Sequence, residues 1–174
     1  MRAHDVVVVL GATGLLGQAV VKACRDSGRP VIGLSRSDGI DFSSPIRTGD
    51  LHAVLDSHRP GLVINAVALT DLTACEEHPS QARNLNALLP AALAAWSRST
   101  STRWIQVSTD HYYSGTENRL HDEDCPVDPP NEYARSKLQG ETLALESEYA
   151  LVVRTNIVGR RGWPGRPTFA EWVH

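Results

Sequence analysis

The fold is decided close to the amino terminus by the stretch Val6-Val7-Val8-Val9-Leu10-Gly11-Ala12-Thr13-Gly14-Leu15-Leu16-Gly17. Its first five residues are apolar and four are β-branched, which predicts a strand buried on both faces, as in a parallel sheet. The three glycines that follow predict a tight turn and the start of a helix. A strand, a glycine turn and a helix in this order are typical of a dinucleotide site, although a βα turn without a ligand is the alternative.

Each glycine of this turn has a separate expected task. Gly11 permits the turn, and Gly14 lets backbone N–H groups approach a pyrophosphate at the helix N-terminus. Gly17 allows the helix to lie close to the strand. The residues that we expect to contact the cofactor here are Gly11, Thr13, Gly14, Leu15, Leu16 and Gly17.

Composition limits the class of protein. The chain has 174 residues, of which 41% are hydrophobic, and a net charge of −3, so nothing favours nucleic acid or an acidic membrane surface as a partner. No 18-residue apolar run or signal-peptide pattern is present, and we expect a cytoplasmic protein. Cys24, Cys75 and Cys125 form no C-x-x-C pair, so we expect neither a disulfide nor a metal site.

The rest of the chain alternates between strand and helix patterns. Short apolar runs predict strands at 31–34, 62–68, 104–107 and 150–153, and helical patterns occupy 14–27, 48–57, 79–98 and 131–149. Pro90 predicts a kink, and Asn131 predicts a helix N-cap. Five strands separated by helices predict an α/β fold, with a doubly wound parallel sheet of the Rossmann type. We expect residues 1–174 to form this one NAD(P)-binding domain.

The end of the second strand favours one nicotinamide cofactor over the other. An NAD site usually has Asp or Glu here to bind the ribose 2′-OH, whereas this chain has Ser35-Arg36-Ser37. Two hydroxyls around a cation suit a 2′-phosphate. Ser35 and Arg36 therefore predict NADP, while Asp38 nearby leaves NAD, with Arg36 as a solvated loop residue, as the alternative.

A tyrosine and a lysine four residues apart are the candidate catalytic pair. Tyr133 and Lys137 would lie one turn apart on the same face of a helix. A lysine ammonium beside a tyrosine would lower the pKa of the phenol toward that of a useful general acid. Ser108 or Thr109, at the end of the fourth strand, would bind the same substrate oxygen. Lysine is rare in this chain, since Lys22 is the only other one.

Several motifs in order resemble the extended short-chain dehydrogenase/reductase family, and within it the dTDP-4-dehydrorhamnose reductase branch. They are the glycine turn, Asp41-Phe42-Ser43, Asn65-Ala66-Val67-Ala68, Val107-Ser108-Thr109-Asp110, Tyr133-Ala134-Arg135-Ser136-Lys137-Leu138-x-Gly140-Glu141 and Val153-Arg154-Thr155-Asn156.

The resemblance implies roles for particular residues. Thr109, Tyr133 and Lys137 would be catalytic, and Tyr133 and Lys137 would also contact the cofactor. Asp41 and Phe42 would hold the adenine. The cofactor groove would be lined by Ala66, Val67 and Ala68. The implied reaction is the NADP-dependent reduction of a 4-keto nucleotide sugar, in a protein whose assembly is compatible with a homodimer.

Two positions depart from that branch. His111 follows Ser-Thr-Asp where the rhamnose enzymes resemble one another in having Tyr, and Asn156-Ile157 replaces Ser-Trp. Both positions lie on the substrate side, so the identity of the sugar is open.

The carboxyl end also differs. Thr168-Phe169-Ala170-Glu171 is a capping box that predicts a helix, yet the sequence stops at His174. Members of the family continue for roughly another hundred residues. We therefore expect residues 155–174 to be the start of a truncated substrate-binding region, and this chain alone to have little or no reductase activity.

Two alternatives to a reductase remain. One is a non-catalytic nucleotide-binding module, similar to the regulatory subunit of methionine adenosyltransferase. The other is an epimerase or dehydratase, which would keep NAD bound and is disfavoured by Ser35-Arg36.

Overall fold

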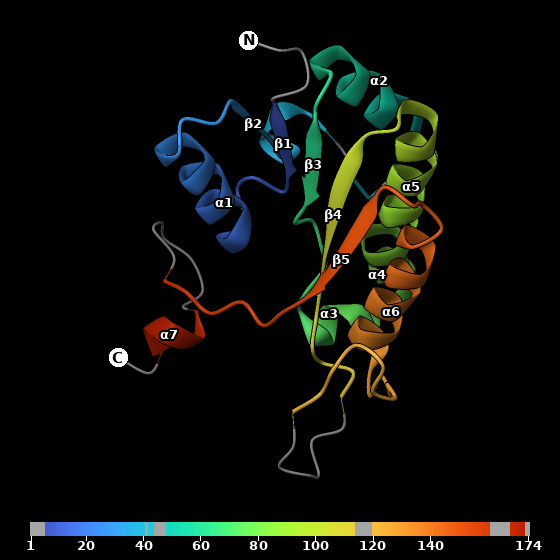
Figure 1. Cartoon of the computed structure of the whole chain (residues 1–174). Coiled ribbons are helices and arrows are strands. Elements are labelled where there is room, and N and C mark those ends of the chain that lie inside the picture. Colours follow the sequence, from blue (N-terminus) through green and yellow to red (C-terminus); the bar gives the residue numbers. More distant parts are fainter. Residues whose placement is uncertain (1–5, 41, 44–47, 114–119, 161–167, 173–174) are drawn as a thin grey trace.

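The computed structural model describes residues 6–40, 42–43, 48–113, 120–160 and 168–172, and its centre is one parallel sheet. The five strands lie side by side in the order β2-β1-β3-β4-β5 (Figure 1). Their bounds are β1 Val7–Leu10, β2 Val31–Leu34, β3 Leu62–Asn65, β4 Arg103–Ser108 and β5 Ala150–Arg154. The predicted α/β fold with a Rossmann-like parallel sheet is confirmed.

Helices connect the strands, but α3 was not predicted and the helix predicted over 131–149 ends at Ala144. The helices that follow β1 and β2 are α1 Leu15–Asp26, the 3-10 turn η1 Arg36–Asp38 and α2 Thr48–His58. Between β3 and β4 lie α3 Leu72–Glu77, α4 Pro79–Arg83, the π-helix η3 Asn84–Leu88 and α5 Leu89–Thr100. The last two are α6 Glu132–Ala144 and α7 Phe169–Trp172. No helix among the described residues is long and apolar enough to cross a membrane.

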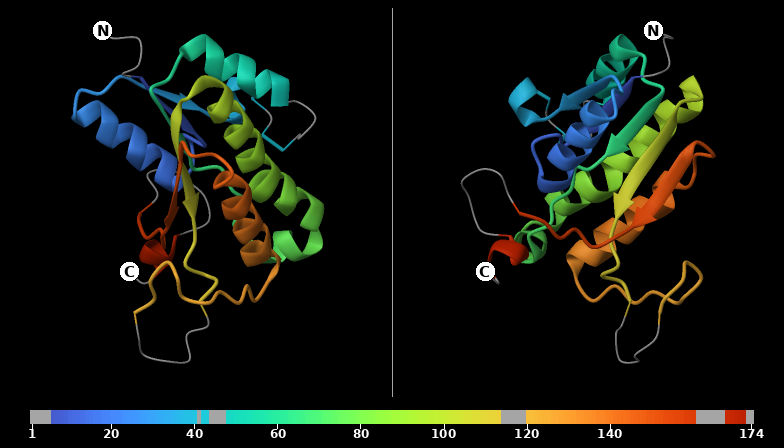
Figure 2. Two further views of the ribbon diagram at one scale, coloured as in Figure 1. Left: turned by 45° about the vertical axis from the view of Figure 1, so that its right-hand side comes forward. Right: turned by 60° about the vertical axis from the view of Figure 1, so that its left-hand side comes forward.

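The two faces of the sheet are covered differently. Helices α2, α5 and α6 cover one face, and α1 covers the other (Figures 1 and 2). The larger core lies under the first group and contains Leu55, Leu93 and Trp96, whereas the smaller one joins α1 to β1 through Val21 and Val9. Because α1 reaches only part of the sheet, two apolar side chains of β5 are exposed: Leu151 and Val153.

The third strand is shorter than predicted. The sequence predicts a strand to residue 68, but β3 ends at Asn65. The Asn65 side chain explains the ending, because its Oδ1 accepts a hydrogen bond from the Val67 N–H at 3.2 Å and its Nδ2 donates to Gln106 Oε1 at 2.8 Å. The chain therefore turns out of the sheet, and the small residues after Asn65 become free to line a cavity.

The predicted kink at Pro90 is a π-helical turn placed just before it. A proline ring clashes with the carbonyl four residues earlier and has no N–H to bind it, and that carbonyl belongs to Asn86, inside η3. Gly140 of α6 lies directly against the same carbonyl, since a Cβ on Gly140 would stand 1.9 Å from Asn86 O. The irregular turn thus lets α6 approach closely, and only glycine fits at the contact.

The last described helix begins with the capping box that the sequence predicts. The Thr168 N–H donates to Glu171 Oε2 at 2.8 Å, and the Glu171 N–H donates to Thr168 Oγ1 at 3.3 Å. Between β5 and this helix the chain runs toward α1, where residues 156–160 line a cavity together with Leu15 and Lys22 (Figure 1).

Candidate functional site

The glycine turn after β1 has the geometry that its sequence predicts. Gly11 has a φ of +79°, in the left-handed region that favours glycine, and its N–H donates to Leu34 O at 2.8 Å. Gly17 lies against the turn, because a Cβ there would stand 2.1 Å from Gly11 O. Gly14 caps α1 without a side chain, and no acidic residue occupies the first turn. The N–H groups that begin α1 are therefore not used by a capping side chain, which suits an anion.

A cavity of 360 Å³ opens above this turn, at the carboxyl end of the strands. Its lining joins the glycine turn to the end of β2 and to the segment after β3. Many of the predicted cofactor residues line it: Gly11, Thr13, Gly14, Ser35, Arg36, Phe42, Ala66, Val67 and Ala68. The size is in the ordinary range for part of a cofactor. A floor without side chains and a cation at one end fit a phosphorylated dinucleotide.

Other predicted cofactor residues lie elsewhere. Leu15 and Leu16 face a separate cavity of 460 Å³ beside residues 156–160, and Gly17 serves the packing of α1. Asp41 lies outside the described residues. Tyr133 and Lys137 do not line the cavity above the glycine turn.

Some residues of the cavity wall were not predicted. They are Ser43, Leu69, Gln81 and Leu85. Gln81 and Leu85 are four residues apart across α4 and η3, so they share a face. Helical spacing alone could have paired these two residues, but only the tertiary structure shows that their face meets the glycine turn.

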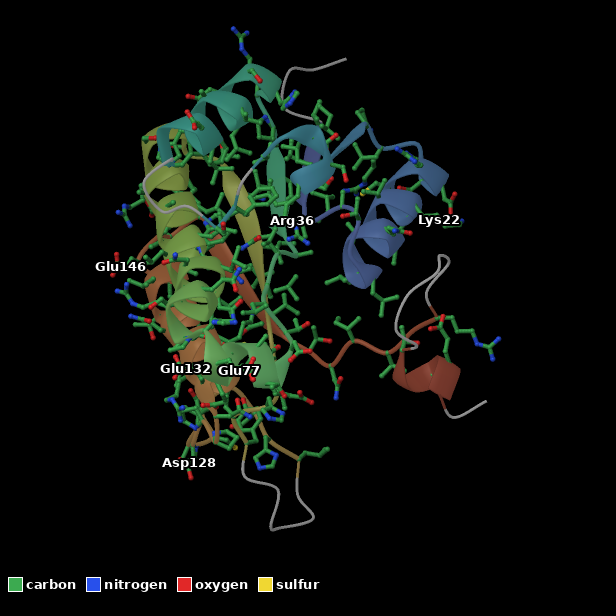
Figure 3. The ribbon with its side chains drawn as sticks, turned by 180° about the vertical axis from the view of Figure 1, so that it is seen from behind. Lys22, Arg36, Glu77, Asp128, Glu132 and Glu146 are labelled. Carbon is green, nitrogen blue, oxygen red and sulfur yellow. The ribbon has the colours of Figure 1, made fainter. Side chains whose placement is uncertain are left out.

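The hydroxyl of Ser35 is not free to bind a phosphate. Both the N–H and the Oγ of Ser35 donate to Asp38 Oδ2, at 2.8 and 2.7 Å, and Ser35 is buried. The sequence predicts that the hydroxyls of Ser35 and Ser37 flank Arg36 and bind a 2′-phosphate. The Ser35 hydroxyl does not fit this role, because it donates to the Asp38 carboxylate. Among the described residues that line the cavity, Arg36 is the one with a positive charge, and its side chain is exposed (Figure 3).

Thr109 and Tyr133 meet at the carboxyl end of β4. Asn131 accepts a hydrogen bond from Ala134 N at 2.9 Å, which starts α6 and fixes where Tyr133 leaves the backbone. Burial raises the pKa of Tyr133, and a hydrogen bond from the Thr109 side chain lowers it in part. The sequence predicts that Lys137 lowers the pKa of Tyr133. The structure differs, because burial of the phenol has the larger effect and raises this pKa.

Lys137 is buried and binds the backbone of β4. Its Nζ donates to Val107 O at 2.7 Å, and the side chain is only 3% exposed. Burial lowers the pKa of Lys137 from 10.5 to about 8, and the charge of Glu141 opposes this shift. The ammonium group of Lys137 therefore lies between α6 and β4, and among the described residues its hydrogen-bond partner is the Val107 carbonyl.

Lys137 makes stability depend on pH in a defined direction. Its folded-state pKa of about 8 lies below the usual 10.5, so between these values the unfolded chain holds more protons and folding becomes more favourable as pH rises. We expect the free energy of unfolding of the wild type, relative to Lys137→Met, to increase from pH 7.5 to pH 10. Urea unfolding at both values checks this. Lys22→Met is the control, since the Lys22 side chain is 76% exposed; equal slopes for the two variants would contradict the expectation.

Asn86 connects the cavity wall to the helix of Tyr133. Its Oδ1 accepts from Leu69 N at 2.9 Å, and its Nδ2 donates to Leu69 O and to Ser136 Oγ, both at 3.0 Å. Ser136 in turn donates to the Tyr133 carbonyl at 2.9 Å. The buried amide thus holds the segment after β3 and α6 at a fixed distance from each other.

A buried ion pair supports the other end of α6, and the sequence did not single it out. Arg154 binds both oxygens of Glu141 through Nε at 3.1 Å, and its Nη2 is 2.8 Å from Oε2. Its Nη1 donates to Tyr113 Oη at 2.6 Å, while Tyr112 donates to Glu141 Oε1 at 3.1 Å. The guanidinium lies 5.3 Å from the centre of the Tyr112 ring. These contacts join β5, α6 and the segment after β4.

A parallel sheet in the order β2-β1-β3-β4-β5, with a glycine turn below a cavity at the carboxyl end of its strands, is a Rossmann-like fold of the short-chain dehydrogenase/reductase type. Residues 5–162 match the family described as the RmlD substrate binding domain. The chain belongs to this family.

Several of the matched relatives are sugar reductases, and others are named as the beta subunit of methionine adenosyltransferase 2. The chain is 35% identical over 174 residues to the "Probable low-salt glycan biosynthesis reductase Agl14" of Haloferax volcanii, which covers 95% of this chain and 58% of that protein. It is 34% identical over 158 residues to the dTDP-4-keto-6-deoxy-D-glucose reductase of Streptomyces niveus, covering 89% of this chain and 54% of that protein. The chain thus spans a little over half the length of these two curated relatives.

Solved structures give the same picture. A dTDP-4-dehydrorhamnose reductase from Clostridium acetobutylicum superposes with a TM-score of 0.78 at 28% identity, over 87% of this chain and 53% of that one. Other solved chains of this fold hold NADP or NAD. The chain is therefore related to NAD(P)-dependent sugar reductases over a little more than half of their length.

Proposed function

We propose that this chain carries the cofactor site and the proton-donating residues of an NADP-dependent reductase of a 4-keto nucleotide sugar. One observation carries the proposal: the cavity above the glycine turn, with Arg36 in its wall, opens at the carboxyl edge of the sheet, where Thr109 follows β4. Ligands of open α/β sheets bind at this edge. Similarity to relatives that are named as sugar reductases supports the same reaction.

The cofactor would be held by the residues of this cavity. The N–H groups at the start of α1 would bind the pyrophosphate, Arg36 would bind the 2′-phosphate and Phe42 would contact the adenine. When bound, NADPH supplies the hydride that reduces the 4-keto carbon.

Tyr133 would supply the proton. Its hydroxyl would donate to the keto oxygen, and the Thr109 hydroxyl would bind the same oxygen as negative charge develops on it. Burial raises the pKa of Tyr133, so the phenol is protonated before reaction, as an acid must be. Lys137, one helical turn from Tyr133, would hold the nicotinamide ribose. The proposed substrate is a nucleotide sugar, as in the similar reductase from Streptomyces niveus.

Arg36 provides the test of cofactor preference. We expect the chain to bind NADPH more tightly than NADH, and Arg36→Ala to weaken NADPH about 10- to 100-fold with little change for NADH, because a charge-assisted hydrogen bond is lost. Titration calorimetry with both cofactors measures this. Arg103→Ala is the matched control, since Arg103 begins β4 at the opposite edge of the sheet. Equal affinities of the wild type for NADPH and NADH would refute the preference.

A further inference from the structure

His111 is the residue that departs from the resembled pattern beside the catalytic threonine, and its backbone orients that threonine. The His111 N–H donates to Thr109 Oγ1 at 3.2 Å. A hydroxyl oxygen that accepts this bond keeps its own proton free for another acceptor, and the Thr109 side chain is hydrogen-bonded with Tyr133. The backbone N–H of His111 thus orients the Thr109 hydroxyl beside Tyr133.

The side chain of His111 makes a second connection, to the cap of α6. Its Nε2 is 3.0 Å from Asn131 Nδ2. The orientation of the Asn131 amide is determined independently, because its Oδ1 accepts from Ala134 N at 2.9 Å as the helix N-cap. The amide nitrogen therefore faces the imidazole and donates to it.

This contact specifies the state of the imidazole. An Nε2 that accepts a hydrogen bond carries no proton, so this contact favours the tautomer of His111 that has its proton on Nδ1. The ring also meets the Tyr133 ring edge-on, with centroids 6.1 Å apart and an angle of 63°. One side chain thus contacts both the cap of α6 and the tyrosine that follows it two residues later.

We propose that His111 is a positioning residue for Tyr133: by accepting the hydrogen bond of Asn131, its imidazole ties the end of β4, which carries Thr109, to the start of α6, which carries Tyr133. The proposal rests on the proposed function only for its consequence in catalysis. Four contacts form the connection, and they join Thr109, His111, Asn131, Ala134 and Tyr133. The connection itself is a property of the free protein.

Nitrogen NMR of the histidine rings tests the connection without any cofactor or substrate. At pH 8 we expect His111 in the wild type to be in the Nδ1–H form, and Asn131→Ser to lose this preference while keeping an oxygen to cap α6. The Nε2–H form in the wild type would overturn the proposal, whether or not the chain is a reductase. His121 serves as the reference ring, because it stacks on Tyr113 and makes no contact with Asn131.

Carbon NMR of the tyrosine rings tests the effect on Tyr133. The chain has four tyrosines, and Tyr133→Phe assigns the signal. We expect His111→Leu and Asn131→Ser each to raise the pKa of Tyr133, because the end of β4 is no longer tied to the start of α6 and the hydrogen bond with Thr109, which lowers this pKa, is weakened. In His111→Gln the amide oxygen can accept from Asn131, so we expect the wild-type pKa of Tyr133. The variant that combines His111→Leu with Asn131→Ser should have the same Tyr133 pKa as either single variant.

The control is His121→Leu, which should leave the Tyr133 titration unchanged. An unchanged titration in His111→Leu, or additive effects of the two substitutions, would refute the positioning role. Loss of NADPH binding with the histidine connection intact would count instead against the proposed function.

Discussion

Tyr133→Phe is expected to lower the rate of NADPH oxidation by about 10²- to 10⁴-fold, the usual contribution of a positioned general acid. Phenylalanine keeps the ring but removes the only proton that the proposed reaction transfers from the protein. NADPH affinity should be unchanged, because Tyr133 does not line the cavity above the glycine turn.

The measurement follows the loss of NADPH absorbance with a dTDP-4-keto-6-deoxy sugar. Since the chain spans a little over half the length of its curated relatives, we expect a slow wild-type rate, and the protein is used in excess over the sugar. Tyr149→Phe is the matched control, because Tyr149 packs against the core near β5. Equal rates for Tyr133→Phe and the wild type, with NADPH bound by both, would favour the alternative of a non-catalytic binding module.

Glu141→Gln is expected to destabilise the fold by about 3 kcal/mol, because it leaves the charge of Arg154 largely buried without its partner. The side chains of Glu141 and Arg154 are 4% and 22% exposed. Arg154 also contacts Tyr113, so the loss should extend to the segment after β4. Urea unfolding at neutral pH measures the change.

A surface ion pair provides the comparison. Glu146 and Arg98 lie 3.9 Å apart, with side chains 58% and 47% exposed, and Glu146 lies at the surface in Figure 3. We expect Glu146→Gln to cost less than about 1 kcal/mol. The double variant Glu141→Leu with Arg154→Leu should recover part of the loss, because apolar side chains need no partner. A cost for Glu141→Gln as small as that for Glu146→Gln would contradict the role of the buried pair.

Local patterns predicted the elements well where their cause is local. The apolar run before Gly11 forms β1, Asn131 caps α6 and Thr168 caps α7, because each depends on residues within one turn. The predictions were less accurate where a distant residue decides. The end of β3 depends on Gln106, which lies 41 residues away from Asn65 in the sequence.

The site divides in the same way. The residues around the glycine turn could be predicted, since the position of a cofactor follows from strand, turn and helix in sequence. Gln81 and Leu85 could not, because α4 and η3 are placed beside the cavity by their packing on α6, which is distant in the sequence. The state of Tyr133 also could not, since burial raises its pKa against the effect expected of Lys137.

The sequence by itself determined the parallel α/β fold, the glycine turn and the set of candidate catalytic residues, because backbone preferences and helical spacing act over a few residues. Only the tertiary structure decided that Asp38 accepts the hydrogen bond of the Ser35 hydroxyl and that Lys137 donates to the Val107 carbonyl. The same holds for His111, which joins Thr109 to the cap of α6. These contacts depend on directional hydrogen bonds and on desolvation, which arise only when distant segments pack together.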